Sequence, residues 1–235
     1  MRDRNQRNLL DTKKLEELSF VVIGAGAIGS FFVMTLAKMG AKKITVYDFD
    51  SIEEHNISNQ MYPLDFIEMK KTDALQIVAR NFGGCEIEVR GKWTPEDAVD
   101  AEVIVSAVDN MDVRKELWGH YNTHCNLFLD GRMSAMVYKV YAVDTDSTVA
   151  SDFYETTLYP QSEAAQERCG EKSIIFTVLG VAGTMLNVLK QWIMNEHRPT
   201  EIVADMYNHT LTKKYHMEEQ YETTTVEDTE TAVNA

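Results

Sequence analysis

Three closely spaced glycines could bring a phosphate group to the backbone of this chain. Gly24, Gly26 and Gly29 form the pattern G-A-G-A-I-G, directly after the apolar run 19–23 and before an apolar pattern of helical period. A glycine turn lets the backbone approach a ligand, and the free N–H groups at a helix amino terminus attract phosphate. This context predicts a nucleotide-binding turn. The alternative is that the glycines only permit close packing of the helix on the sheet.

An acidic residue stands where a ribose would be bound. Asp48 lies nineteen positions after Gly29, at the end of a second apolar run, 43–48. A carboxylate at this place can accept hydrogen bonds from the two ribose hydroxyls. The glycine pattern alone is typical of NAD-binding proteins, so an NAD-dependent oxidoreductase or sensor stays open as an alternative function.

Further polar residues follow this aspartate in a fixed order. The segments D-F-D-S-I-E-E-H-N-I-S-N-Q, K-T-D-A-L and V-D-N-M-D-V-R hold Asn56, Gln60, Lys71, Asp109 and Arg114. The series resembles the ubiquitin-activating-enzyme-like superfamily, the group that includes ThiF, MoeB and HesA. This resemblance depends on several motifs in order rather than on the glycines, and Gln60 and Arg114 match positions whose role is less defined.

The resemblance, which covers roughly residues 10–195, implies an ATP-dependent adenylyltransferase. Members of the superfamily bind ATP with Mg²⁺ and attack its α-phosphate with a substrate carboxylate, which yields an acyl adenylate and pyrophosphate. The substrate is typically the carboxyl terminus of a ubiquitin-like or sulfur-carrier protein. Some relatives act instead on a modified tRNA nucleoside or a short peptide. The resemblance also implies a homodimer.

Individual residues take roles from the same resemblance. Asp48 corresponds to the ribose-binding aspartate, Asn56 to the phosphate-contacting asparagine and Lys71 to the phosphate-binding lysine. Asp109 corresponds to the aspartate that engages Mg²⁺. The chemistry fits these roles independently, because a lysine and a metal-bound carboxylate would neutralise the charge that develops on a departing pyrophosphate.

Each of these assignments has a structural alternative. Asn56 would then be a turn residue in H-N-I-S-N, and Lys71 would be a solvated helix charge like the adjacent Lys70. Asp109 or Asn110 would cap the amino terminus of the helix that follows.

One position departs from the pattern of the superfamily. The family commonly has Arg before the Gln of this loop, whereas Asn59 stands there in this chain. A cation expected near the phosphates is therefore missing, which also leaves open a non-catalytic interaction module that keeps the nucleotide-binding fold. Family dimers insert an amino-terminal arginine into the partner's ATP site, and we select Arg7 for this role. Solvated charge on a flexible terminus is the alternative.

One cysteine is a candidate acyl acceptor. Cys169 lies in R-C-G-E-K-S, before an apolar helix, where related enzymes often place a thiol that accepts the activated acyl group. A thiol beside Arg168 and a helix amino terminus can have a lowered pKa; a bystander cysteine is the alternative. Cys85 and Cys125 border predicted strands and are expected in the core. The sequence has no C-x-x-C pair of the kind that holds zinc in some relatives, so no zinc is expected.

The elements that must position these residues alternate between strand and helix. Strands are predicted at 19–23, 43–48, 86–90 and 102–107, and helices at 27–39, near 65–81 and at 112–121. This order predicts an α/β fold, with a doubly wound, Rossmann-like and mainly parallel sheet.

The pattern changes after residue 126. Strands at 127–130 and 135–143 follow each other with no helix between them, which predicts antiparallel strands in the C-terminal half. Asp130, Gly131 and Arg132 are then expected at the edge of the substrate cleft, or else in a charged turn. The last predicted elements are a helix and then a strand or turn, at 174–195 and 201–206.

Composition limits the class of protein and its partners. We predict a single adenylation domain at 1–216 with a polar loop at 145–172, followed by an acidic disordered tail at 217–235. With 37 acidic and 23 basic residues in 235, the formal net charge is -14. This charge disfavours membrane and general nucleic-acid binding, and makes tRNA the less favoured substrate. The amino terminus lacks the apolar run of a signal peptide and the cysteines fit a reducing compartment, so we expect a cytoplasmic location.

Overall fold

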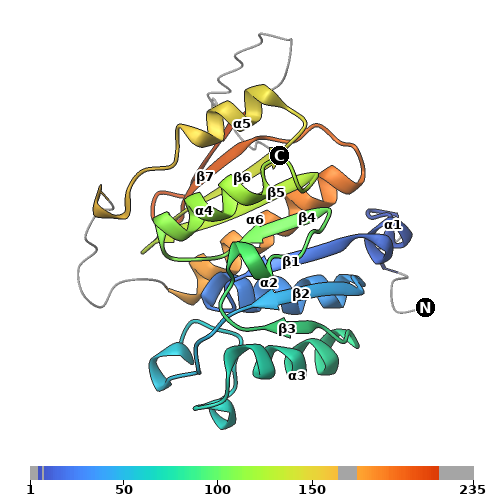
Figure 1. Cartoon of the computed structure of the whole chain (residues 1–235), viewed down its shortest axis with the longest axis vertical. Coiled ribbons are helices and arrows are strands. Elements are labelled where there is room, and N and C mark those ends of the chain that lie inside the picture. The colour runs from blue at the N-terminus through green and yellow to red at the C-terminus, as the bar shows by residue number, and fades with distance from the viewer. Residues whose placement is uncertain (1–4, 7, 164–173, 217–235) are drawn as a thin grey trace, which may run out of the picture.

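The computed structural model describes residues 5–6, 8–163 and 174–216, and a single sheet runs through this part of the chain (Figure 1). The sheet has eight strands in the order β3-β2-β1-β4-β5-β6-β7-β8. The strands are β1 Ser19–Ile23, β2 Lys43–Tyr47, β3 Glu88–Arg90, β4 Val103–Ser106, β5 Leu127–Ser134, β6 Val137–Asp144, β7 Glu201–Asp205 and β8 Thr210–Lys214. Pairing is parallel from β3 to β5 and antiparallel from β5 to β8. The predicted fold class is confirmed.

Helices cover both faces of this sheet (Figure 1). In the described residues the α-helices are α1 Thr12–Glu17, α2 Ala27–Met39, α3 Lys71–Gly83, α4 Met111–Tyr121, α5 Thr148–Glu155 and α6 Ile175–Ile193. Helices α2, α3 and α6 share one apolar cluster with the sheet, and α4 and α5 share another. None of the described helices is long and apolar enough to cross a bilayer.

Strand β1 shows why a continuous apolar run was needed in the centre of the sheet. Phe20 and Val22 join the cluster under α2, α3 and α6, whereas Val21 and Ile23 join the cluster under α4 and α5. Successive side chains of a strand point to opposite faces, so a strand covered on both sides needs apolar residues at every position.

Helix α2 has the bounds that the sequence predicts. It ends at Gly40, whose φ of 117° is left-handed and whose N–H donates to the carbonyls of Leu36 and Ala37. Glycine adopts this conformation without a steric penalty, which makes it a common residue after a helix end. At its other end, α2 begins at Ala27, directly after the glycine turn and the carboxyl end of β1.

Helix α3 begins later than the predicted start near residue 65. Leu64–Phe66 form a separate 3-10 helix after Pro63, and Glu68 has a positive φ of 73°. A residue in that conformation cannot continue an α-helix, so the helix starts at Lys71. Lys71 is thereby placed at the amino end of α3.

The second half of the chain is more regular than predicted. Helix α5 lies within the segment 145–172 that was predicted as a polar loop, and the 3-10 helix Gln161–Glu163 follows it. Strand β5 continues to Ser134, beyond the predicted end at residue 130, and β8 was not predicted at all. The predicted tail, 217–235, lies outside the described residues.

Candidate functional site

The three glycines of the turn have different structural reasons. A Cβ on Gly24, which has a φ of 100°, would lie 2.5 Å from the carbonyl oxygen of Ala107, and one on Gly29 would lie 1.8 Å from that of Gly24. Close packing thus requires glycine at both positions. A Cβ on Gly26 would meet no described atom within 4 Å, and no described side chain caps α2 at this residue. The space in front of the helix amino terminus is open for an anion.

Asp48 lies directly beside this turn, one residue after the end of β2. Its Oδ2 accepts a hydrogen bond of 2.7 Å from the backbone N–H of Ala25, and its Oδ1 accepts one of 2.8 Å from that of Asp50. Each carboxylate oxygen has a second lone pair, so both can still accept a ligand hydroxyl. The geometry is compatible with the ribose-binding role predicted for Asp48.

The side chain of Lys71 is almost entirely covered at the same edge of the sheet. It is 9% exposed, and its Nζ lies 2.8 Å from Oδ2 of Asp50, which is half exposed. The adjacent Lys70 is exposed, and its ammonium donates to the carbonyl of Phe49. Lys71 is therefore not a solvated helix charge, in contrast to its neighbour.

Two residues that sequence reasoning missed connect Lys71 to the glycine turn. Asp50 accepts both from the ammonium of Lys71 and, through its backbone carbonyl, from the N–H of Lys71. The buried hydroxyl of Tyr62 lies 2.6 Å from the carbonyl oxygen of Ala25 and 3.3 Å from that of Lys71. Burial raises the pKa of Tyr62 well above its usual value, and the charge of Asp48 adds to the rise, so this hydroxyl stays protonated and can donate.

Asn56 and Gln60 lie in the loop between β2 and α3. Asn56 is buried, and its Oδ1 accepts a hydrogen bond of 3.0 Å from the N–H of Glu53 as part of a capping box on the 3-10 helix Glu54–Asn56. The turn alternative for Asn56 thus describes what its side-chain oxygen Oδ1 does. Oε1 of Gln60 is buried and accepts no hydrogen bond from the described residues, which leaves it free for a donor.

The question of which residue caps α4 has a clear answer. Oδ1 of Asn110 accepts hydrogen bonds from the N–H groups of Asp112, at 2.9 Å, and Val113, at 3.1 Å. Asn110 is therefore the cap, and the adjacent Asp109 is exposed. Asp109 follows β4, which pairs in parallel with β1, so its carboxylate is left available at the same carboxyl edge of the sheet as the glycine turn.

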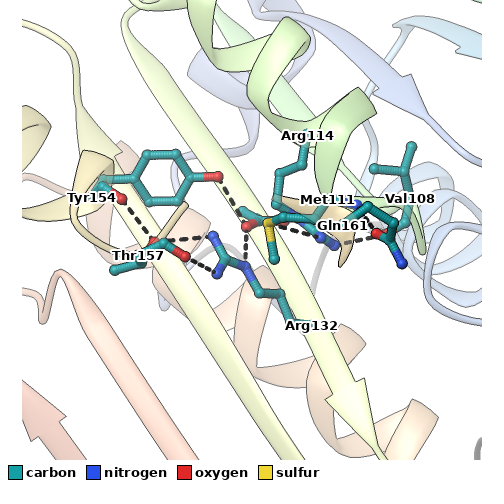
Figure 2. Close-up of polar contacts among 8 residues, drawn as sticks. Val108, Met111, Arg114, Arg132, Tyr154, Thr157 and Gln161 are labelled. Carbon is teal, nitrogen blue, oxygen red and sulfur yellow. Dashed lines mark hydrogen bonds and ion pairs between the residues drawn. The ribbon is translucent and has the colours of Figure 1, made fainter. Parts of the chain in front are cut away.

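Asp130 and Arg132 correct a prediction. They lie within β5 rather than after it, and Asp130 is fully buried. Arg114 Nε and Arg132 Nε donate to its two carboxylate oxygens at 2.7 Å and 2.6 Å, and Tyr154 donates at 2.9 Å (Figure 2). Burial alone would raise the pKa of Asp130, but the two guanidinium groups outweigh it and the pKa is lowered. Asp130 is thus an internal counter-ion and does not line a substrate cleft.

Gly131 does not edge a cleft either. A Cβ at this position would lie 2.6 Å from Sδ of Met185, so α6 packs directly on the backbone of β5 here. The predicted charged turn is also wrong, because residues 127–134 form one continuous strand paired with β6.

Comparison with known families decides the relationship. A sequence model of the ThiF family matches residues 4–229. The chain belongs to the ThiF family. The resemblance predicted from the ordered motifs is confirmed.

Three curated relatives show the range of the family. The sulfur carrier protein ThiS adenylyltransferase of Bacillus subtilis is 32% identical over 111 residues, 43% of this chain and 33% of the relative. tRNA threonylcarbamoyladenosine dehydratase 2 of Saccharomyces cerevisiae is 28% identical over 127 residues, 48% of this chain and 28% of the relative. Adenylyltransferase and sulfurtransferase MOCS3 of Anopheles gambiae is 25% identical over 194 residues, 78% of this chain and 43% of the relative. The chain spans less than half the length of each.

Solved structures share the fold of this ThiF-family chain. A structure of PaaA has a TM-score of 0.71 at 13% identity, covering 92% of this chain and 69% of that chain. A structure of Escherichia coli MccB with ATP has a TM-score of 0.68 at 14% identity, covering 88% of this chain and 67% of that chain. At these identities the likeness shows the fold alone.

The family's Mg²⁺ can be tested against the residues present. Asp109 offers a free, exposed carboxylate, and the described residues contain no group of three His, Cys, Asp or Glu side chains placed for a metal. Mg²⁺ is commonly held by one or two carboxylates plus phosphate oxygens and water. Asp109 fits such a site, in which phosphate oxygens of the nucleotide and water would supply the remaining ligands.

The remaining predicted residues divide into two groups. Arg7 and Cys169 lie outside the described residues. Cys85 and Cys125 are free and buried, as predicted for core residues. Burial raises the pKa of both thiols, that of Cys125 to about 12, so neither is a ready nucleophile.

Proposed function

We propose that this ThiF-family protein is an ATP-dependent adenylyltransferase that activates a carboxylate. An oxygen of the substrate carboxylate attacks the α-phosphorus of ATP, the bond from that phosphorus to the bridging oxygen breaks, and pyrophosphate leaves. The products are an acyl adenylate and pyrophosphate. The negative charge that develops on the departing pyrophosphate must be neutralised for this bond to break.

The observation that carries this proposal is the meeting of the open glycine turn, Asp48 and Lys71 at one edge of the sheet. Asp48 contacts the turn through Ala25, and Tyr62 connects the turn to the backbone of Lys71. In this arrangement the amino terminus of α2 binds phosphate, Asp48 binds the ribose, and Lys71 binds the phosphate chain. Asn56 and Gln60 contribute polar contacts from the loop above.

Asp109 would hold Mg²⁺ against the phosphates. Bound there, the ion would polarise the phosphate oxygens and stabilise the negative charge that develops on pyrophosphate. Asn59 stands where the family commonly has arginine, so Lys71 and the ion must supply most of the positive charge. We propose that Arg7 of a second subunit adds the missing cation, which requires a homodimer.

For the substrate we propose the carboxyl terminus of a small ubiquitin-like or sulfur-carrier protein. The matching relatives include an adenylyltransferase named for the sulfur carrier ThiS and enzymes named for activating ubiquitin-like modifiers. A tRNA substrate is less favoured, because a net charge of -14 repels a polyanion. We place the reaction in the reducing cytoplasm, where Cys169 would remain a thiol able to accept the acyl group.

Pyrophosphate exchange into ATP tests the function. Purified protein is incubated with Mg²⁺, ATP, labelled pyrophosphate and candidate carriers, each intact or lacking its carboxyl-terminal residue. We expect label in ATP only with protein, Mg²⁺ and an intact carrier. Binding of NAD in place of ATP would favour the oxidoreductase alternative. Tight ATP binding without exchange for any carboxylate would favour a non-catalytic interaction module.

A further inference from the structure

Arg132 joins two segments that are distant in the sequence. Its Nε donates to Oδ2 of Asp130 at 2.6 Å, while its other two nitrogens donate to the carbonyl oxygen of Thr157, at 2.9 Å, and to Oγ1 of Thr157, at 3.1 Å (Figure 2). The side chain is 13% exposed and its charge lies 4.4 Å from the ring centre of Tyr141. This fork fixes the chain just after α5 to the centre of the sheet.

Arg114 forms the matching half of the arrangement. Its Nε donates to the other oxygen of Asp130 at 2.7 Å, and its Nη2 donates to the carbonyl oxygen of Val108 at 2.5 Å. Val108 directly precedes Asp109. One buried carboxylate therefore holds two guanidinium groups, and each of them in turn holds a backbone carbonyl.

Gln161 connects the two held segments. Its Oε1 accepts a hydrogen bond of 2.7 Å from the N–H of Met111, and its own N–H donates to Oδ1 of Asp112 at 3.1 Å. Figure 2 shows Gln161 against the first turn of α4, beside Val108 and Met111. The segment that Arg132 fixes at Thr157 is thus also fixed to the start of α4.

These contacts close a ring that contains Asp109. Starting from Asp130, the ring passes through Arg114, Val108–Met111, Gln161, Thr157 and Arg132, and returns to Asp130. Asp109 lies in the arc from 108 to 111, whose two ends are held by Arg114 and Gln161. We propose that Arg132 is a positioning residue for Asp109, acting through this closed ring of hydrogen bonds and the backbone segments 108–111 and 157–161 that they join. The inference rests on the proposed function, in which Asp109 holds Mg²⁺.

The physical reason is that the side chain of Asp109 is itself exposed. Its carboxylate can be held in place for a metal only through the backbone on either side of it. Groups that orient a metal ligand commonly change metal affinity about 10- to 100-fold when they are removed. A buried charge cluster is a weak source of stability but defines geometry, because each partner is costly to leave unpaired.

The test measures how strongly Mg²⁺ and ATP favour each other's binding. Isothermal titration calorimetry gives the Kd of ATP with Mg²⁺ and with chelator, and the ratio of the two is the coupling factor for that variant. We expect Asp109→Ala to abolish the coupling and Arg132→Met to lower it about tenfold. Arg132→Lys keeps the charge but cannot reach all three acceptors, so we expect an intermediate value. Gln161→Ala breaks the ring near the surface and should lower the coupling in a protein that stays folded.

Arg198→Met is the matched control. Arg198 pairs with Asp144 and is 17% exposed, similar to Arg132, and Asp144 is paired with Leu127 at the opposite edge of the sheet. Arg198→Met loses the same charge as Arg132→Met, so we expect thermal destabilisation with a coupling factor within about twofold of the wild type. Wild-type coupling in Arg132→Met and Gln161→Ala would overturn the ring. Absence of ATP binding by the wild-type protein would instead overturn the proposed function.

Discussion

The carboxylate of Asp48 accepts a hydrogen bond of 2.7 Å from the backbone N–H of Ala25. This contact joins the end of β2 to the glycine turn after β1, so the group proposed to bind ribose also holds the turn proposed to bind phosphate. Under that proposal, ligand binding and turn geometry depend on the same side chain.

Asp48→Ala should therefore weaken ATP binding in two ways. It removes the proposed acceptor for the ribose hydroxyls, and it removes the hydrogen bond that holds the glycine turn. Hydrogen bonds to a charged group are worth about 1.5–3 kcal/mol, and a loss of about 2 kcal/mol raises the Kd of ATP about 30-fold. Calorimetric titration measures it. Asp65→Ala, which alters an exposed carboxylate on the 3-10 helix Leu64–Phe66, is the control and should bind ATP like the wild type. Equal Kd values for the two variants would exclude Asp48 from the site.

Substitution at two glycines should separate ligand binding from folding. A Cβ on Gly26 has open space, so Gly26→Ala should lower the free energy of unfolding by about 1 kcal/mol or less. The methyl group would nevertheless stand where a phosphate approaches the helix, raising the Kd of ATP about tenfold or more, at least about 1.4 kcal/mol. Gly29→Ala would overlap a carbonyl oxygen and should destabilise the fold by about 3 kcal/mol. Urea unfolding and ATP titration distinguish these effects, and tight ATP binding by Gly26→Ala would contradict the assignment.

The two adjacent lysines offer an internally controlled test of charge. Lys71→Ala removes a covered ammonium at the site and should lower pyrophosphate exchange about 100-fold or more, the usual cost of losing a group that stabilises developing charge. Lys70→Ala removes an exposed ammonium one residue away and should leave exchange within about threefold of the wild type. Similar rates for both variants would show that Lys71 has no specific role.

The parallel half of the fold is predictable because its signals are local. The apolar run of β1, the periodic apolar residues of α2 and the glycine after it each specify an element without reference to the rest of the chain. The resemblance then places Asp48, Lys71 and Asp109 in order, and the structure puts Asp48 and Lys71 at the same edge of the sheet. Their chemical roles are still predictions.

The errors arise where tertiary contacts decide the outcome. All five residues of β8 are exposed, so neither apolar alternation nor an apolar run marks it as a strand; pairing with β7 forms it. Helix α5 was missed because its segment is polar. Its Tyr154 donates to the buried carboxylate of Asp130, a contact that the sequence does not show. Arg114 lies 16 and 18 positions before Asp130 and Arg132, and this spacing does not reveal a buried cluster. The pairing of Arg114 with Asp130 depends on the packing of α4 against β5.

The stability of the protein should depend on the ionisation of Asp130. Its pKa is lowered in the folded protein, because two guanidinium groups outweigh the effect of burial, whereas an unfolded aspartate has a pKa of about 3.9. Above pH ~5 the group is ionised in both states and its contribution is complete. As the pH falls below that value, the unfolded state binds the proton first, and the contribution is lost progressively toward the folded pKa.

Asp130→Asn tests this dependence. The variant leaves two buried guanidinium groups without a counter-ion and should lose about 3–5 kcal/mol of unfolding free energy at neutral pH. Urea unfolding of wild type and variant from pH 7 to pH 3 should show a difference in unfolding free energy that is constant down to about pH 5 and then narrows. Tyr154→Phe removes only one neutral donor to Asp130, so it should cost about 1 kcal/mol and keep the wild-type pH dependence. A gap that stays constant to pH 3 would mean that the folded protein does not lower the pKa of Asp130.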